Sequence, residues 1–290
     1  MAPRTILITG GAGMLASELH TYLSSQPGYE VVALSRTQLD VSQTGAAEAA
    51  IAAYRPYCVI NTAALLADES EESPEIAFAT NAWAVRMLAR ACQRHSSILI
   101  QCSTCGLFGD EIRAYQEYDQ VTLKTVYARS KYAGEEYVRG LCERYFVLRL
   151  GWLYGGSLEH RRNFVVARYR EAVSGSLLES ACDKHGSPTY AGDVARAIPW
   201  LLDSEEYGTY HLANQGGCTR AEYVRAIVRE FGLDTEIKQV DSSHFPRKAP
   251  VPDCEMLTSL NLGYAGLPLL PPWQEALSRY VRSIADQVKT

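Results

Sequence analysis

The chain has 290 residues, of which 47% are hydrophobic and 21% charged, and its formal net charge is −5. That length is enough to bury the core of one large or two small domains. The mildly acidic balance gives no general attraction to nucleic acid or to anionic membranes, and no apolar run approaches the ~18 residues of a membrane-spanning helix. We therefore expect a globular protein with no nucleic-acid or membrane partner.

The first hundred residues alternate short β-rich runs with helical patterns. Strands are predicted at 5–9, 31–35, 57–64 and 97–104, and helices at 14–25, 46–55 and 74–95. Strands separated by helical patterns of ten or more residues indicate βαβ units and a parallel sheet. The acidic run at 68–75 is interpreted as a solvated loop and helix start.

A long loop at 105–124, a helix at 125–144 and a strand at 145–155 follow. Beyond residue 155 the alternation fades, with helices near 161–174, 191–203 and 219–231, a strand at 208–214, and many prolines and glycines in the last forty residues. We predict an α/β fold with a Rossmann-type doubly wound parallel sheet. Residues 1–155 form its dinucleotide-binding domain, to which some later segments return, and residues 156–290 form a smaller substrate-binding domain.

The eight cysteines, at positions 58, 92, 102, 105, 142, 182, 218 and 254, are scattered through apolar segments. A secreted disulfide scaffold is usually short and dense in cysteine, and this chain is neither. The N-terminal apolar run is too short for a signal peptide and is interrupted by GGAG. Cys102 and Cys105 have the spacing of a redox or metal pair, but the sequence has no second such pair. We expect reduced thiols, no metal site and a cytoplasmic location.

A glycine turn follows the first predicted strand. Gly10, Gly13 and Ala16 have the G-x-x-G-x-x-A spacing, at the point where the strand gives way to a helix. Glycine permits the tight turn there, and the backbone N–H groups that open the helix, at Met14 and Leu15, can face a pyrophosphate. The pattern predicts dinucleotide binding; the alternative is a glycine-rich turn that binds nothing.

The end of the second strand discriminates between cofactors. Proteins that bind NAD usually place an acidic residue there for the ribose 2′-hydroxyl, whereas an arginine accommodates the 2′-phosphate of NADP. Here the strand ends in Ser35 and Arg36, and the next acid is Asp40, followed by Val41. We predict that these four residues lie at the cofactor and that NADP is preferred over NAD. The alternative is that Arg36 is a solvated loop cation.

A Y-x-x-x-K pair, Tyr127 and Lys131, opens the helix predicted at 125–144. Residues four apart share one helical face, so the ammonium can lie near the phenol and lower its pKa from the usual ~10. Such pairs also arise by chance in a tyrosine-rich chain. The position of this pair makes it informative, because it follows the glycine turn and a strand that ends in Ser103-Thr104.

With these motifs the chain resembles an extended short-chain dehydrogenase/reductase, and within that superfamily it is similar to the dTDP-4-dehydrorhamnose reductase group. The matching segments are ILITGGAGMLASEL, VINTAALLADESEESPEIAFATNA, STCGLFGD, VYARSKYAGEEYV, LRLGWLYGG, NFV, HGSPTYAGDVARAI and GTYHLAN. The segment HGSPTYAGDVARAI is the most telling of these, because it lies outside the cofactor domain that the whole superfamily shares.

The resemblance implies a catalytic triad of Thr104, Tyr127 and Lys131, in which spacing to Phe108-Gly109 favours Thr104 over Ser103. It implies further that Asn61, Ala63 and Ala64, in the second half of the third predicted strand, line the cofactor. Trp152 and Asn163 are implied to face a sugar nucleotide. A homodimer is a candidate assembly.

The reaction that the resemblance implies is the NADPH-dependent reduction of the C4 keto group of a nucleotide-linked 4-keto-6-deoxy sugar. Tyr127 would protonate the developing alkoxide, Thr104 would hydrogen-bond the same oxygen, and Lys131 would hold the nicotinamide ribose. Cys105-Gly106 stands where the group typically has Asp-Tyr. These two residues are therefore expected to line an altered sugar pocket, as in the assembly of a specialised deoxysugar or natural product.

Two alternatives stay open at this point. One is an NAD-dependent nucleotide-sugar epimerase, which the missing acid at position 35 disfavours. The other is a non-catalytic regulatory subunit with the same fold, which the intact triad disfavours.

Overall fold

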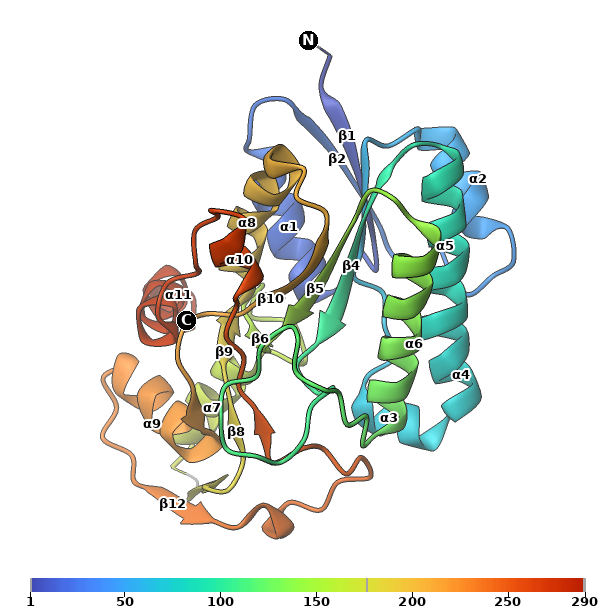
Figure 1. Cartoon of the computed structure of the whole chain (residues 1–290). Coiled ribbons are helices and arrows are strands. Elements are labelled where there is room, and N and C mark those ends of the chain that lie inside the picture. Colours follow the sequence, from blue (N-terminus) through green and yellow to red (C-terminus); the bar gives the residue numbers. More distant parts are fainter. Residues whose placement is uncertain (1, 176, 289–290) are drawn as a thin grey trace.

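The computed structural model describes residues 2–175 and 177–288 and is built around one six-stranded sheet (Figure 1). All neighbouring strands of this sheet are parallel, in the order β10-β5-β4-β3-β1-β2. Their bounds are β1 (Arg4–Thr9), β2 (Tyr29–Leu34), β3 (Cys58–Asn61), β4 (Ile98–Thr104), β5 (Tyr145–Leu150) and β10 (Gly208–Leu212). Near-continuous apolar runs form these strands because helices cover both faces of the sheet.

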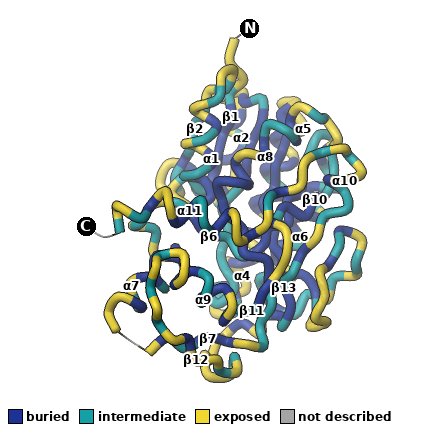
Figure 2. Tube along the Cα trace, turned by 90° about the vertical axis from the view of Figure 1, so that its left-hand side faces the viewer, coloured by how far each residue is buried: buried dark blue, intermediate teal, exposed yellow. Residues whose placement is uncertain are grey.

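One face of the sheet packs on α1 (Met14–Ser24), α8 (Ala191–Ser204) and the short α10 (Asn261–Tyr264). The other face packs on α2 (Ala46–Tyr54), α5 (Ala84–Arg94) and α6 (Val126–Leu141). Figure 2 shows the buried residues gathered along the strands and on the inner sides of these helices. This arrangement confirms the prediction of a doubly wound α/β fold.

The strand order reverses beside β1, which has β2 on one side and β3 on the other. The chain passes from β1 to α1 on one face of the sheet and from β3 to α5 on the other face, so the two connections diverge at the carboxyl ends of β1 and β3. Ligands of open α/β sheets bind at such a switch point.

The predicted strand at 145–155 is two strands, because the chain leaves the large sheet at Gly151. After β5, β6 (Trp152–Tyr154) pairs instead with β9 (Pro188–Tyr190). A Cβ at Gly151 would lie 2.3 Å from the carbonyl oxygen of Ser187 and 2.4 Å from Thr189 Oγ1. Only glycine therefore allows the two strands to approach so closely.

The predicted helix at 74–95 also differs in detail. It consists of α4 (Pro74–Phe78), a π-helical turn η1 (Ala79–Trp83) and α5, and it follows a separate short helix, α3 (Ala67–Glu72). Asn81 lies in the π-helical turn, where its side chain bonds both to the backbone of Leu65 and to Ser130 on α6. The wider turn thus accommodates a buried amide that joins three segments.

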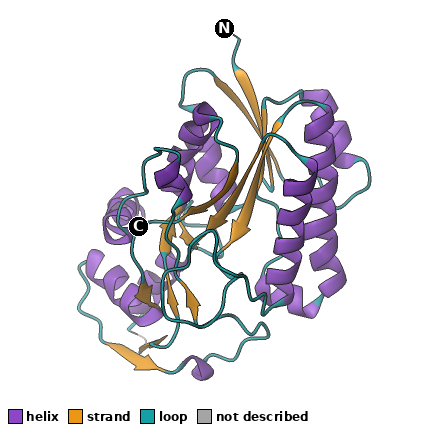
Figure 3. Ribbon diagram, in the orientation of Figure 1, coloured by secondary structure: helices purple, strands orange, loops and turns teal. Residues whose placement is uncertain are grey.

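A smaller lobe lies at the carboxyl edge of the sheet (Figure 3). Its helices are α7 (Phe164–Val173), α9 (Arg220–Glu230), the 3₁₀ turn η2 (Ser242–His244) and α11 (Trp273–Val288). Its strands, besides β6 and β9, are β7 (Leu178–Ala181), β8 (His185–Gly186), β11 (Cys218–Thr219), β12 (Ile237–Val240) and β13 (Cys254–Glu255). Because α8, β10 and α10 return to the large sheet, the lobe is not continuous in sequence, and the boundary at residue 155 stays a prediction.

No helix in the described ranges is long and apolar enough to cross a membrane. All eight cysteines are free thiols, and seven of them are buried.

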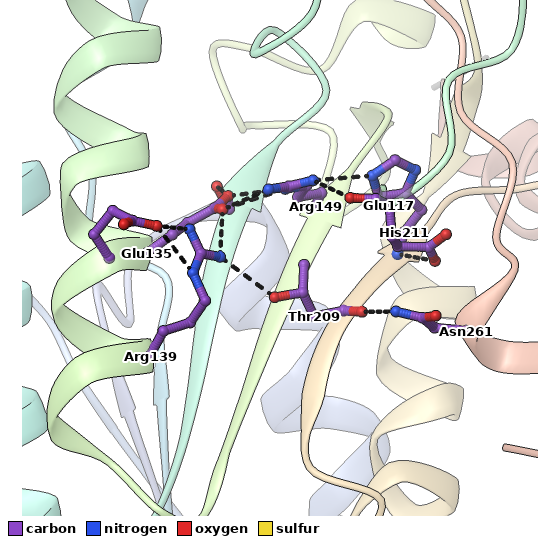
Figure 4. A network of polar contacts seen from close by, with 9 residues as sticks. Glu117, Glu135, Arg139, Arg149, Thr209, His211 and Asn261 are labelled. Atoms are coloured by element: carbon purple, nitrogen blue, oxygen red, sulfur yellow. Dashed lines mark hydrogen bonds and ion pairs between the residues drawn. The ribbon is translucent and has the colours of Figure 1, made fainter. Parts of the chain in front are cut away.

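A buried polar network links the strands to the C-terminal segment (Figure 4). The carboxylate of Glu135, on α6, is fully buried and accepts hydrogen bonds from Ser103 Oγ at 2.5 Å and from Arg149 Nη2 at 2.9 Å. Arg149 Nη1 in turn lies 3.5 Å from Nε2 of His211, whose Nδ1 is 3.1 Å from the carbonyl oxygens of Tyr115 and Thr258. This pattern fixes a neutral imidazole that donates from Nδ1.

The histidine predicts a pH dependence of stability. Burial lowers the pKa of His211 to about 4, whereas an unfolded histidine titrates near ~6.5. The unfolded chain therefore takes up this proton first, and the free energy of unfolding should fall as the pH drops from about 6.5 towards 4. We expect urea unfolding to show a loss of about 1–2 kcal/mol from this residue between pH 7 and pH 5. His211→Gln should lack that component, and the exposed His20→Gln serves as the control. Parallel pH profiles for His211→Gln and the native chain would contradict the assignment.

Candidate active site

The glycine turn lies at the switch point, as its sequence position predicts. Gly10 has a φ of +68°, and a Cβ there would lie 2.9 Å from the backbone nitrogen of Ala63 after β3. Gly13 caps α1 without a side-chain hydrogen bond, so the N–H groups at the start of the helix keep their capacity to bind an anion. Met14 is half-buried at this end, whereas the side chain of Leu15 packs in the core, which leaves only its backbone to face a ligand.

The other predicted cofactor residues on this side are spread over the end of β2 and the following turn. Arg36 is exposed, and its Nε lies 3.5 Å from Asp40 Oδ2. The hydroxyl of Ser42 donates to Asp40 at 2.6 Å, and this contact is the main cause of the lowered pKa of Asp40. Ser35 Oγ donates to Gln38 Oε1 at 2.8 Å, while Val41 is a core residue. Ser35 and Arg36 thus form the accessible part of this group.

The predicted residues at the end of β3 and just after it have different surroundings. Asn61 is buried; its Oδ1 accepts from Thr9 Oγ1 at 2.5 Å, and its Nδ2 donates to Gln101 Oε1 at 2.7 Å. Asn61 therefore ties three strands together at the switch point. Ala63 and Ala64 are half-buried beside Gly10 and form its opposite wall.

Thr104 ends β4, and Tyr127 begins α6 at the same edge of the sheet. The hydroxyl of Thr104 accepts a hydrogen bond from Gly106 N–H at 3.1 Å. The hydroxyl proton of Thr104 therefore remains available for donation. Thr125 caps α6 by accepting from Ala128 N–H at 2.9 Å, which fixes the first turn that carries Tyr127.

The pKa of Tyr127 corrects the prediction from the Y-x-x-x-K pair. Burial raises this pKa, and the negative charge of Glu255 acts in the same direction, while a hydrogen bond with Thr104 opposes them. Lys131 is itself buried, and its Nζ donates to the carbonyl oxygen of Cys102 at 2.6 Å. One N–H of the ammonium is thus bonded to the strand. Because the pKa of Tyr127 is raised, its side chain is a neutral phenol at physiological pH rather than a readily formed phenolate.

Trp152 lies at the mouth of a cavity of about 590 Å³ in the smaller lobe. A Cβ at Gly186 would lie 2.1 Å from the indole, so glycine is required for the ring to rest on β8. On the ring, the Arg220 guanidinium stacks 3.4 Å from the centroid, and the indole Nε1–H donates to Glu255 Oε2 at 2.7 Å. The cavity walls include Trp152, Phe164, Arg168, Lys184, Arg220 and Glu255.

Cys105 and Gly106, which follow Thr104, are both buried. Burial raises the pKa of the Cys105 thiol well above its usual range and raises that of Cys102 to about 12. Both thiols are thus uncharged and poorly nucleophilic. No group of three or more metal-binding side chains occurs among residues 2–175 and 177–288.

Asn163 faces the protein rather than the cavity. Its side chain caps α7 by accepting from Val166 N–H at 3.3 Å, and it donates to Tyr280 Oη at 2.5 Å. The structure therefore brings Thr104, Tyr127, Lys131 and Trp152 towards one region, and Asn163 supports that region from behind.

Glu255 and Arg220 are site residues that sequence reasoning missed. Glu255 is part of a two-residue strand in the irregular C-terminal segment, and Arg220 is the first residue of α9. Neither belongs to a motif, so the sequence carried no signal for them beyond their charge.

Comparison with known proteins gives concordant matches along the whole chain. The model of the RmlD substrate binding domain family matches residues 4–285. The chain is 36% identical to a dTDP-4-dehydrorhamnose reductase of Mycobacterium tuberculosis (strain CDC 1551 / Oshkosh), with 97% of this chain and 93% of that protein covered. It is 29% identical to a dTDP-4-keto-6-deoxy-D-glucose reductase of Streptomyces niveus, with 94% and 95% covered. A solved dTDP-4-dehydrorhamnose reductase from Bacillus anthracis str. Ames, in complex with NADP, has a TM-score of 0.92 at 29% identity, covering 97% and 99%.

The glycine turn generates a prediction about folding and binding together. Gly10→Ala adds a Cβ against the Ala63 backbone at a positive φ, and we expect a loss of about 2 kcal/mol in the free energy of unfolding. Dinucleotide binding, measured by fluorescence titration, should weaken as well. Gly28→Ala is the matched control, because Gly28 has a φ of +93° with no atom within 4 Å of an added Cβ. It should destabilise the fold by less and leave binding intact; equal effects of both variants would refute the close contact.

Proposed function

The chain belongs to the RmlD substrate binding domain family, and on this basis we propose that it is an NADPH-dependent oxidoreductase that reduces the C4 keto group of a nucleotide-linked 4-keto-6-deoxy sugar. The observation that carries the proposal is a neutral Tyr127 whose pKa is influenced by the nearby Thr104 and Glu255, of which Glu255 also lines the cavity of the smaller lobe. Tyr127 can act as the acid and Thr104 as the hydrogen-bond donor for a carbonyl oxygen of the substrate.

The residues at the switch point fit a dinucleotide phosphate. Gly10 and Gly13 keep the turn free of side chains, the first N–H groups of α1 are uncapped, and Arg36 offers an exposed guanidinium. NADPH, when bound, supplies a hydride for the keto carbon. Met14, Ser35, Ala63 and Ala64 complete our proposed binding surface.

The chain's own residues handle the oxygen and its proton. As the keto carbon gains a hydride, its oxygen becomes an alkoxide, and Tyr127 donates the proton that turns it into a hydroxyl. Thr104 donates a hydrogen bond to the same oxygen, which stabilises the developing charge. Lys131, through Cys102, holds the first turns of α6 against β4 so that the phenol keeps its position.

The cavity offers cationic and aromatic groups to a substrate. Arg168, Lys184, Arg220 and Arg247 line it together with the rings of Trp152 and Phe164, and the acids Glu179, Asp241 and Glu255 line it as well. Cations and aromatic surfaces of this kind can bind a nucleoside diphosphate group. We assign the nucleotide part of the substrate to this cavity and the sugar to the end nearest Thr104.

Cellular location and assembly are part of the same proposal. Eight free thiols support a reducing compartment such as the cytoplasm. Exposed apolar side chains at Ile76, Phe78 and Trp83 support a homodimer.

The function can be tested by following NADPH absorbance with a panel of nucleotide-linked 4-keto-6-deoxy sugars. We expect oxidation of NADPH with at least one of them. Tyr127→Phe should lower turnover by about 100-fold or more while it binds NADPH normally, because it removes only the proton donor. Tyr137→Phe, on the same helix, serves as the control. Near-normal turnover by Tyr127→Phe would defeat the assignment of the acid, and turnover without net oxidation would indicate an epimerase.

Arg36 generates a prediction about cofactor choice. Arg36→Ala should weaken NADPH binding about tenfold or more and leave NADH binding unchanged, because the guanidinium interacts only with the 2′-phosphate. Isothermal titration calorimetry measures both constants, with the exposed Arg90→Ala as the control. Equal losses for the two cofactors, or tighter native binding of NAD than NADP, would contradict this role.

A further inference from the structure

Glu255 is held rigidly although it lies in an irregular part of the chain. Its strand β13 pairs in parallel with β8, where Glu255 is opposite Gly186. The next residue, Met256, accepts a hydrogen bond from Tyr115 N–H at 2.8 Å, and Leu257 N–H donates to Ser187 Oγ at 3.2 Å. The carboxylate therefore projects from a fixed backbone.

Its two oxygens have different surroundings. Oε2 accepts the indole hydrogen of Trp152 at 2.7 Å. Oε1 lies 3.0 Å from the point that a Cβ at Gly106 would occupy, and that point is only 3.5 Å from Thr104 Oγ1. Oε1 accepts no hydrogen bond from the residues that the structure describes. One oxygen thus anchors the side chain, while the other is an acceptor on the side facing the Thr104 hydroxyl.

The absence of a side chain at Gly106 gives Glu255 this access. Any larger residue there would press on Oε1 and separate it from Thr104. The neighbouring Arg220, stacked on Trp152, balances the charge of the carboxylate in this half-buried place. Glu255 also lines the cavity of the smaller lobe, so a ligand bound there can donate a hydrogen bond to Oε1.

Thr104 and Glu255 therefore present complementary groups to neighbouring atoms of a ligand. The Thr104 hydroxyl, whose oxygen already accepts from Gly106, donates to a carbonyl. The Glu255 oxygen requires a donor a short distance away. A ketone with a hydroxyl on the adjacent carbon offers this pair, and in a 4-keto-6-deoxy sugar the only neighbouring carbon that can carry a free hydroxyl is C3.

We propose that Glu255 is a specificity-determining residue whose free carboxylate oxygen accepts a hydrogen bond from the C3 hydroxyl, so that the preferred substrate is a nucleotide-linked α-hydroxy ketone rather than a 3-deoxy or 3-O-alkylated sugar. This inference rests on the proposed function, since it takes the carbonyl at Thr104 to be the C4 keto group.

The test compares a 3-hydroxy and a 3-deoxy 4-keto sugar nucleotide in the native protein and in Glu255→Gln. In this variant the amide oxygen can still accept the hydrogen bond from Trp152. The amide NH₂ group then takes the place of Oε1 near Thr104, so a hydrogen-bond donor replaces an acceptor. We expect kcat/KM for the 3-hydroxy substrate to fall about 10- to 100-fold, mainly through KM, while the 3-deoxy substrate and the KM of NADPH hardly change. The exposed Glu230→Gln is the control. Equal losses with both substrates, or no loss, would overturn the proposal.

A second variant keeps the carboxylate. Gly106→Ala places a methyl group 3.0 Å from Oε1 and should reproduce the selective loss with the 3-hydroxy substrate. This outcome decides the question if Glu255→Gln fails to fold. If Gly106→Ala instead affects both substrates alike, the free oxygen of Glu255 has no role in selecting them.

Failure of the proposed function can be told apart from failure of this inference. Calorimetric binding of the corresponding nucleotide-linked alcohols, with and without the C3 hydroxyl, requires no turnover. If the native protein oxidises no NADPH but still binds the 3-hydroxy compound more tightly through Glu255, only the reaction is wrong. If it turns over both ketones equally, only the role of Glu255 is wrong.

Discussion

The geometry around Tyr127 and Thr104 depends on a negative charge that has no access to water. Glu135 is fully buried one helical turn beyond Lys131, and a lone carboxylate in that position would be strongly destabilising. It is compensated by Arg149 from β5, Arg139 from its own helix and a short hydrogen bond from Ser103 on β4 (Figure 4). Apolar residues can replace such a network without loss of stability, so we attribute to it the positioning of α6 rather than a net gain in stability. It fixes α6 against the strand that ends in Thr104.

The same network reaches the segment that carries Glu255. Glu117 accepts hydrogen bonds from the backbone of His211 at 2.9 Å, from Ser259 Oγ at 2.6 Å and from Leu260 N–H at 2.9 Å. Burial keeps His211 neutral, and burial also opposes the charge of Glu117. Hydrogen bonds from Ser259 and from the backbone of His211 and Leu260 nevertheless hold the pKa of Glu117 below its usual value. The C-terminal segment is thereby anchored to the edge of the large sheet. The loop with Glu117, the strand with His211 and the segment at 259–260 are thus held together although they are far apart in sequence.

Local patterns were sufficient to predict the sheet and the switch point. Buried strands, the turn at Gly10 and the pair Tyr127 and Lys131 each follow from a few adjacent residues. Features set by distant contacts could not be predicted. The strand beginning at Tyr145 ends at Gly151 only because another strand approaches there, and the burial that raises the pKa of Tyr127 is a property of the assembled site.

The acidic run at 68–75 illustrates the same limit. The local pattern predicts a solvated loop and helix start, and this prediction leaves out the ion pairs that the run makes. Asp68 pairs with Arg247 at 2.9 Å, Glu72 pairs with Lys248, and Glu69 pairs with Arg162. These cations belong to the smaller lobe and lie between 93 and 179 residues further along the chain. A charge pattern read locally indicates exposure, whereas its partners are determined by how the two lobes meet.

The protonation state of the site favours one direction of the chemistry. Reduction of a ketone needs a proton donor, whereas oxidation of an alcohol needs a base. Burial keeps Tyr127 neutral, the negative charge of Glu255 acts in the same direction, and Lys131 gives its hydrogen bond to Cys102. A phenolate would therefore gain little stabilisation from these protein groups. The surroundings of Tyr127 make it an acid, as the reduction of a keto sugar requires.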